Sequence, residues 1–354
     1  MSRFFSSKYK NLVPYTPGEQ PKDMQYIKLN TNESPFPPSE KAIAYASDAA
    51  KSLQLYPDPT CSELTKKVAK TIGVKPENVL LTNGSDEILN FAFMAFCDTS
   101  HPAIFPDITY GFYSVFAELN GIPYEEVPLK EDFSIDLANY KGVNKTIFIA
   151  NPNAPTGICL SLSEIEEILK TNPDSVVVID EAYIDFGGES AVALIDKYDN
   201  LLVTQTFSKS RSMAGARLGF GVGNASLIAD LNTVKYSTNP YNINKMTMFA
   251  ALGMLEDEDY TRKNCEIIIK NREETSLKLK EMGFLITDSK TNFIFAKHLK
   301  VSGEKIYLKL KEKGILVRHF TKPEICEYNR ITVGTKEQMD ALLKAISEIL
   351  EEEK

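Results

Sequence analysis

Strand-like and helix-like segments alternate along the chain from about residue 79 to about residue 223. Val176–Ile179 is a run of four β-branched residues, which predicts a strand buried on both faces, and Leu201–Val203 is a second apolar run of this kind. Alternation of this type indicates βαβ units, and it therefore predicts a mostly parallel sheet.

The pattern changes after about residue 250. Helical periodicity dominates, with a Lys/Glu-rich solvent face over residues 264–282, and a final helix is expected from about Lys336. Between these two helices lie three further strand-like runs, Asn292–Ala296, Ile315–Arg318 and Arg330–Val333. A chain of 354 residues also exceeds one typical hydrophobic core. We therefore expect a large domain over residues 36–250 and a smaller α+β domain over residues 251–354, which is joined by an N-terminal arm, residues 1–35.

The stretch Thr206–Arg217 follows the strand-like run Leu201–Val203 and contains a single lysine, Lys209. A lysine that forms a Schiff base needs little bulk around it and neighbours that hold an anion. Thr206 and Ser208 can donate hydrogen bonds to a phosphate, and the guanidinium of Arg217 can pair with it. This pattern suggests a lysine bound to pyridoxal 5′-phosphate, although a solvated Lys/Arg-rich turn would explain the segment equally well.

Asp180 stands at the end of the buried strand that begins at Val176, where open α/β sheets place ligand-binding groups. Its carboxylate could hold a pyridine nitrogen protonated, and Tyr183 could bind the ring hydroxyl of the same cofactor. A helix N-cap at Asp180 is the alternative. Another strand-like run ends in Asn151–Gly157, a turn rich in Asn, Pro and Gly, and such turns often carry polar contacts to ligands.

Val79–Thr82 is followed by Asn83, Gly84 and Ser85 and then by an apolar helical pattern. Ser85 is expected to cap this helix, with acidic residues in its first turn. The free N–H groups at the start of the helix could bind a phosphate. Taken alone, however, a capped helix without a ligand is the simpler interpretation.

Together and in this order, these four segments resemble the fold-type I pyridoxal-phosphate-dependent aminotransferases, in particular the histidinol-phosphate aminotransferases. The resemblance covers most of the chain. It also includes the stretches Leu12–Gly18, Lys28–Pro35, Tyr56–Asp58 and Arg330–Thr335. It implies an α/β fold with a mostly parallel, seven-stranded type of sheet in the large domain.

Carried over position by position, the resemblance implies a Schiff base between Lys209 and pyridoxal phosphate, with the freed lysine later moving a proton. Asp180 would pair with the pyridine nitrogen, Tyr183 would contact the ring oxygen, and Tyr110 would stack on the ring. The residues placed around the cofactor phosphate are Gly84, Ser85, Asp86, Thr206, Ser208 and Arg217. One position departs from the family pattern: Ala154 stands where most relatives have an asparagine that contacts the ring oxygen, and Asn153 is the nearest amide.

On the substrate side, Arg330 would bind the carboxylate of an amino acid or the phosphate of a phosphorylated amine. Arg318 and Tyr15 would help to hold that phosphate. Tyr56 would reach into the neighbouring subunit, which implies a homodimer with shared active sites.

The activity implied is transfer of an amino group between L-histidinol phosphate and 2-oxoglutarate, in histidine biosynthesis. A threonine-phosphate decarboxylase or an aromatic-amino-acid aminotransferase would share Lys209, Asp180 and Arg217. A non-catalytic, cofactor-binding regulator is disfavoured, because such regulators usually carry a DNA-binding module and none fits before Tyr15.

Composition is consistent with a cytoplasmic enzyme. A hydrophobic content of 43% and a charged content of 25% are typical of soluble globular proteins, and a net charge of −8 argues against a nucleic-acid surface. The five cysteines lack a CxxC pair, and the three histidines show no zinc spacing, so reduced thiols and no metal site are expected. The chain has no stretch of eighteen apolar residues for a membrane span and no secretory signal.

Overall fold

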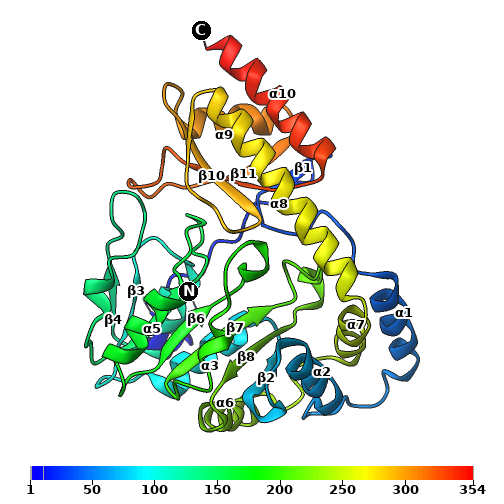
Figure 1. Ribbon diagram of the computed structural model, residues 1–354, viewed down its shortest axis with the longest axis vertical. Coiled ribbons are helices and arrows are strands. Elements are labelled where there is room, and N and C mark those ends of the chain that lie inside the picture. The colour runs from blue at the N-terminus through cyan, green and yellow to red at the C-terminus, as the bar shows by residue number, and fades with distance from the viewer. Residues whose placement is uncertain (1, 11, 354) are drawn as a thin grey trace.

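The computed structural model describes residues 2–10 and 12–353 and contains two separate sheets (Figure 1). Over the described residues the larger sheet has seven strands in the order β2-β8-β7-β6-β5-β3-β4. Strand β8 runs antiparallel to both of its neighbours, β2 and β7, and the other neighbouring pairs are parallel. These strands are β2 (Val79–Thr82), β3 (Ala103–Pro106), β4 (Tyr124–Val127), β5 (Thr146–Ala150), β6 (Val177–Asp180), β7 (Leu201–Thr206) and β8 (Gly219–Gly223). The predicted mostly parallel, seven-stranded sheet is confirmed.

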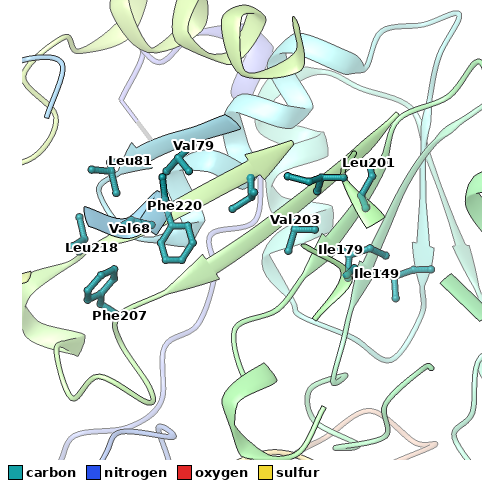
Figure 2. Packing of buried hydrophobic residues seen from close by; sticks show 14 of the residues in the cluster. Val68, Val79, Leu81, Ile149, Ile179, Leu201, Val203, Phe207, Leu218 and Phe220 are labelled. Carbon is teal, nitrogen blue, oxygen red and sulfur yellow. The ribbon is translucent and has the colours of Figure 1, made fainter. Parts of the chain in front are cut away.

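Helices cover both faces of this sheet, because successive side chains on each strand point to opposite sides and both sides are apolar. On β5, Ile147 and Ile149 belong to the core on one face, and Phe148 belongs to the core on the other. Figure 2 shows the first of these cores, in which the rings of Phe207 and Phe220 lie close together, with centres 6.0 Å apart. The first face packs on α2 (Ser62–Ile72), α5 (Leu162–Thr171) and α7 (Lys245–Leu255), and the second on α3 (Ser85–Phe96), α4 (Phe112–Asn120) and α6 (Ala225–Thr238).

The smaller sheet lies above the larger one in Figure 1 and has the strand order β1-β11-β12-β10-β9. Its strands are β1 (Ile27–Leu29), β9 (Phe284–Ile286), β10 (Phe293–His298), β11 (Ile315–His319) and β12 (Asn329–Thr332). One face packs on helices α8 (Glu258–Glu281), α9 (Gly303–Glu312) and α10 (Lys336–Glu352). Val317 and Ile331 point into that core, so the residues next to them, Arg318 and Arg330, point to the opposite face.

Two details of the structure bear on the sequence-based picture. Helix α7 contributes Ala251 and Leu255 to the core of the larger sheet, so a division at residue 250 falls inside this helix. Together with α7, α1 (Glu40–Ala49) belongs to the large-domain side, where Ala42 joins the same core. Ser85 is also not a helix cap. It is the first residue of α3, because Gly84 with φ +80° already occupies the capping position.

Candidate active site

Most of the residues singled out from the sequence surround one cavity at the carboxyl ends of β6 and β7. Parallel strands end at the same edge of a sheet, so polar residues that follow them in sequence meet in space. The predicted residues that line this cavity are Ser85, Asp86, Tyr110, Asp180, Tyr183, Thr206, Ser208, Lys209 and Arg217. Ala154 also lines it.

Asp180 lies at the end of β6 and is buried. Tyr113 donates a hydrogen bond to its Oδ2 (3.1 Å) and Thr204 donates one to its Oδ1 (3.2 Å). Burial raises the pKa of Asp180 to about 6, although both hydrogen bonds favour the ionised form and act in the other direction. A carboxylate held in this way is suited to bind a cationic N–H group at the bottom of the cavity.

The start of α3 forms the anion-binding end of the cavity. The first N–H groups of a helix have no intrahelical partners, and the positive end of the helix dipole lies there. The guanidinium of Arg217 lies against Gly84, where an added Cβ would come within 2.7 Å of Nη2. Gly219 on β8 allows a similarly close approach to Ser85, because its Cβ would lie 2.3 Å from the Ser85 main-chain nitrogen. These two glycines bring the helix start and the arginine together.

Asp86 keeps Arg217 and Tyr110 in place. Its Oδ2 accepts a hydrogen bond from Arg217 Nη2 (2.8 Å), and its Oδ1 accepts one from the hydroxyl of Tyr110 (2.6 Å). Burial, and then the charge of Asp86, raise the pKa of Tyr110 well above its ordinary value, so this tyrosine stays protonated. Because the Asp86 carboxylate would repel a phosphate, any contact from Asp86 to an anion would come from its backbone N–H.

Lys209 lies where this cavity meets a larger one, because it lines both, as do Tyr110, Ala154 and Tyr183. Its Nζ donates to the main-chain oxygen of Thr31 (3.5 Å) and lies 5.7 Å from the ring centre of Tyr183. The segment that carries Lys209 is fixed by Asp185, which accepts hydrogen bonds from Ser210 and from Arg211. The amine therefore projects from an anchored backbone into both cavities.

The larger cavity contains the predicted residues Tyr15, Arg318 and Arg330. The two arginines are directly opposite each other on the antiparallel strands β11 and β12. Like charges in this position repel, and burial lowers the pKa of Arg330. Nε of Arg330 is buried without a hydrogen-bond partner among the described residues.

The hydrogen-bond acceptors of these two arginines are main-chain oxygens, which bind a guanidinium group more weakly than an anion does. Nη2 of Arg330 donates to the main-chain oxygen of Asn30 (3.1 Å), and Nη1 of Arg318 donates to that of Pro17 (3.5 Å). The carboxylate of Glu19 lies close enough to Arg318 to be influenced by it, but it is bound by Lys311 and Tyr307. The arrangement can bind an anionic ligand next to Lys209.

Apart from Gly84, which lies against Arg217, two predicted residues do not line either cavity. Asn153 does not point into either cavity: its amide donates to Ile108 O (2.9 Å) and Thr156 Oγ1 (3.0 Å), and its oxygen accepts from Thr109 (2.8 Å). These bonds hold the side chain within the loops, so the structure does not bring Asn153 together with the other predicted residues. Tyr56 is 81% exposed and stacks on Tyr241, with ring centres 4.7 Å apart.

Sequence reasoning missed residues that hold the site in place. Tyr113 and Thr204 bind Asp180, and Asn32 binds Tyr183. Tyr113 lies three positions after Tyr110 in the same stretch, and Thr204 lies on the strand next to β6. Alternation along β7 could have indicated Thr204, whereas nothing local to Asn32 indicates its contact with a residue 151 positions away.

Comparison with known proteins agrees with this geometry. Residues 24–346 match the model of the family described as aminotransferase class I and II. A histidinol-phosphate aminotransferase from Brachyspira hyodysenteriae is 51% identical, over 99% of this chain and 99% of that protein. One from a Marinomonas species is 50% identical, over 98% of this chain and 99% of the relative.

A solved structure shares the fold. The crystal structure of histidinol-phosphate aminotransferase from Sinorhizobium meliloti in complex with pyridoxal-5′-phosphate superposes with a TM-score of 0.91 at 21% identity, covering 100% of this chain and 99% of that one. Over the described residues, no helix is long and apolar enough to cross a membrane, and no group of His, Cys, Asp and Glu is arranged to hold a metal ion.

Proposed function

This chain belongs to the family of class I and II aminotransferases, and on that basis we propose that it moves an amino group between L-histidinol phosphate and 2-oxoglutarate, with pyridoxal phosphate as its cofactor. The family match and the full-length relatives named histidinol-phosphate aminotransferase support the reaction. The observation that carries the substrate assignment is the pair Arg318 and Arg330, which face each other beside Lys209 without a bound carboxylate among the described residues.

The residues of the first cavity fit pyridoxal phosphate. A phosphate matches the N–H groups at the start of α3, the hydroxyl groups of Ser208 and Thr206, and Arg217. In the same cavity, the carboxylate of Asp180 matches a protonated pyridine nitrogen. The close approach that Gly84 and Gly219 allow gives the anion a place without side-chain bulk.

When bound, pyridoxal phosphate supplies a ring that accepts the electron pair left on the substrate Cα. Asp180 would hold the proton on the ring nitrogen, and Tyr113 and Thr204 would keep its carboxylate ionised and correctly oriented. Lys209 would take the proton from the substrate Cα on its Nζ, and general acid–base catalysis of this kind contributes roughly a hundred- to ten-thousand-fold in rate. Tyr110, fixed by Asp86, would lie against the ring.

The larger cavity would bind the anionic groups of both substrates. A phosphate monoester is close to a dianion at neutral pH, so it can balance both guanidinium groups at once. It would also supply an acceptor for Arg330 Nε, which has none among the residues that the structure describes. Tyr15, which stacks on Phe112 with ring centres 4.2 Å apart, would close this cavity from the N-terminal arm. The carboxylate of the oxo acid would use the same arginines in the second half of the reaction.

Rapid mixing of the cofactor-loaded protein with single amino donors tests this proposal. Histidinol phosphate should convert the cofactor absorbance to that of the aminated form within one turnover, whereas phenylalanine should react far more slowly. Carbon dioxide released from phosphothreonine, without conversion of the cofactor, would instead identify a decarboxylase. Lys209→Ala should lose both the absorbance band of the bound cofactor and turnover, and retention of both would refute the role of the lysine.

The remaining parts of the proposal concern assembly. Tyr56 lies among exposed apolar side chains, with Leu53 54% exposed and Leu55 61% exposed. Exposed apolar groups of this kind often mark an interface, and we propose a homodimer in which Tyr56 completes the partner's site. We also propose that the enzyme is cytoplasmic and that the two domains divide between α7 and α8. Light scattering of wild type and Tyr56→Ala, with cofactor affinity measured in parallel, tests the shared site.

A further inference from the structure

Asn32 connects the smaller sheet to the hydroxyl of Tyr183. It lies between β1 and α1, it is buried, and it lines the larger cavity. Its side-chain Nδ2 donates a hydrogen bond to the Tyr183 hydroxyl oxygen, with a distance of 2.9 Å. Tyr183 also lines the first cavity, whereas Asn32 does not, so the Asn32 amide reaches that cavity only through Tyr183.

The orientation of the Asn32 amide follows from its other contacts. Its main-chain N–H donates to Thr332 Oγ1 (2.9 Å), so the Thr332 hydroxyl is left to donate its own hydrogen to Asn32 Oδ1 (3.0 Å). The oxygen of the amide is therefore committed to Thr332, and the NH₂ group faces Tyr183. The main-chain oxygen of Asn32 accepts from Asn292 Nδ2 (3.0 Å), which anchors the same residue a third time. Its φ of +57° is in the left-handed region, which asparagine tolerates better than most residues.

This contact determines what the Tyr183 hydroxyl can do. A tyrosine hydroxyl has one hydrogen to donate, and because its oxygen already accepts from Asn32, the hydrogen is free for a ligand. Accepting one hydrogen bond also makes the hydroxyl a stronger donor, because bonds in a chain polarise one another. Ala154 lines the same cavity with only a methyl group, and the amide of Asn153 is bound elsewhere.

We propose that Asn32 is a positioning residue that directs the Tyr183 hydroxyl to the ring oxygen of the cofactor, and that it supplies through Tyr183 the amide contact that Ala154 cannot make. This inference rests on the proposed cofactor. With the cofactor bound, a donor at its ring oxygen would stabilise the negative charge there, and it would thereby lower the pKa of the cofactor nitrogen bonded to Lys209. The other charged or titratable groups around Tyr183 stay the same in the variants below; they are Lys209, Asp180, Asp86, Arg217, Arg330, Tyr15 and Tyr110.

The test is Asn32→Asp in the cofactor-loaded enzyme, with the absorbance of the bound cofactor titrated against pH. The substitution keeps the shape and the acceptor for Thr332, but it replaces the donor to Tyr183 with an acceptor that attracts the tyrosine hydrogen. We expect the midpoint of this absorbance titration to rise by about one pH unit and the cofactor dissociation constant to rise about tenfold. Both changes correspond to the free energy of about one hydrogen bond. Asn292→Asp is the matched control. It changes a neighbouring buried amide that binds Asn32 but not Tyr183, and the midpoint should stay within about a third of a unit.

Repeating the substitution in a Tyr183→Phe background separates the hydrogen-bond path from the added charge. The part of the shift that passes through Tyr183 should vanish there, leaving only the effect of the aspartate charge. An equal shift in both backgrounds would overturn the inference. If Asn32→Asp does not fold, Asn32→Gly tolerates the same backbone angle without a charge and should raise the midpoint in wild type but not in Tyr183→Phe. A wild-type protein without cofactor absorbance would refute the proposed function, whereas a normal wild-type band with no shift in either Asn32 variant would refute only this inference.

Discussion

Replacing Asp180 with asparagine in the cofactor-free protein measures what the buried carboxyl costs the fold. Burial raises the pKa of Asp180 from 3.8 to about 6. A difference of about two pKa units corresponds to about 3 kcal/mol of unfolding free energy. The carboxyl binds its proton more tightly in the folded protein, so its contribution is fully favourable below about pH 4 and is lost as the pH rises through about 6. Asparagine does not titrate, so the variant lacks this loss.

The assay is urea unfolding of both cofactor-free proteins at a series of pH values. The difference in unfolding free energy should change in favour of Asp180→Asn by about 2 kcal/mol between about pH 4.5 and about pH 7.5. Glu181, whose pKa burial raises to about 7, titrates in the same window, but it is present in both proteins and cancels in the difference. The constant part of the difference reports the changed hydrogen bonds to Tyr113 and Thr204, and only the pH-dependent part tests the argument.

If the difference in unfolding free energy between the two proteins does not change across this pH range, the reasoning is refuted, because the carboxyl would then have the same pKa in the folded and unfolded chain. A difference of the opposite sign would mean that its hydrogen bonds outweigh burial. In either case the site would not need a cationic ring nitrogen to compensate a buried charge. With cofactor bound, the same comparison should reverse, since wild type gains the ion pair and the variant does not.

Three further outcomes follow from the same contacts. Tyr113→Phe removes the hydrogen bond to Asp180. The pH at which Asp180 loses its stabilising contribution to the unfolding free energy should therefore rise by about one unit, whereas Tyr140→Phe should leave this pH unchanged. Phe148→Ala removes a ring that stacks in the sheet core and should lower the unfolding free energy by about 3–5 kcal/mol in urea titrations. Arg330→Met should lower kcat/KM for histidinol phosphate by about a hundredfold, and Arg330→Lys should recover only part of the loss.

Each of these predictions has its own control. The Tyr140 hydroxyl is buried and has no hydrogen-bond partner among the described residues, so equal shifts from both tyrosine variants would rule out a specific effect on Asp180. Phe4→Ala changes a ring that is 80% exposed and should cost little, and a similar cost for Phe148→Ala would contradict the packing argument. Arg262→Met on α8 removes an exposed arginine that pairs within its own helix, and it should leave kcat/KM unchanged.

Many of the residues that line the first cavity could be predicted from local sequence because they follow strands. Asp180 ends β6, and Lys209 follows β7, and these strands are parallel neighbours, so the two residues meet once the sheet forms. The helix start after Gly84 was predicted for the same reason, although the glycine and not Ser85 holds the capping position. The placement of Asn153 away from both cavities could not be predicted, because the direction of a loop side chain depends on which neighbouring loops supply its hydrogen bonds.

What the sequence by itself determined is the set of buried strands, the helices between them, and the chemical groups at their ends, because hydrophobic alternation and turn residues act over a few positions. Only the tertiary structure decided that Arg318 and Arg330 face each other, since this depends on the register of two antiparallel strands. It also decided that Asn32 supports Tyr183 and that Tyr113 supports Asp180. These pairs are far apart in the chain, and their contact exists only after the two sheets and the arm have packed.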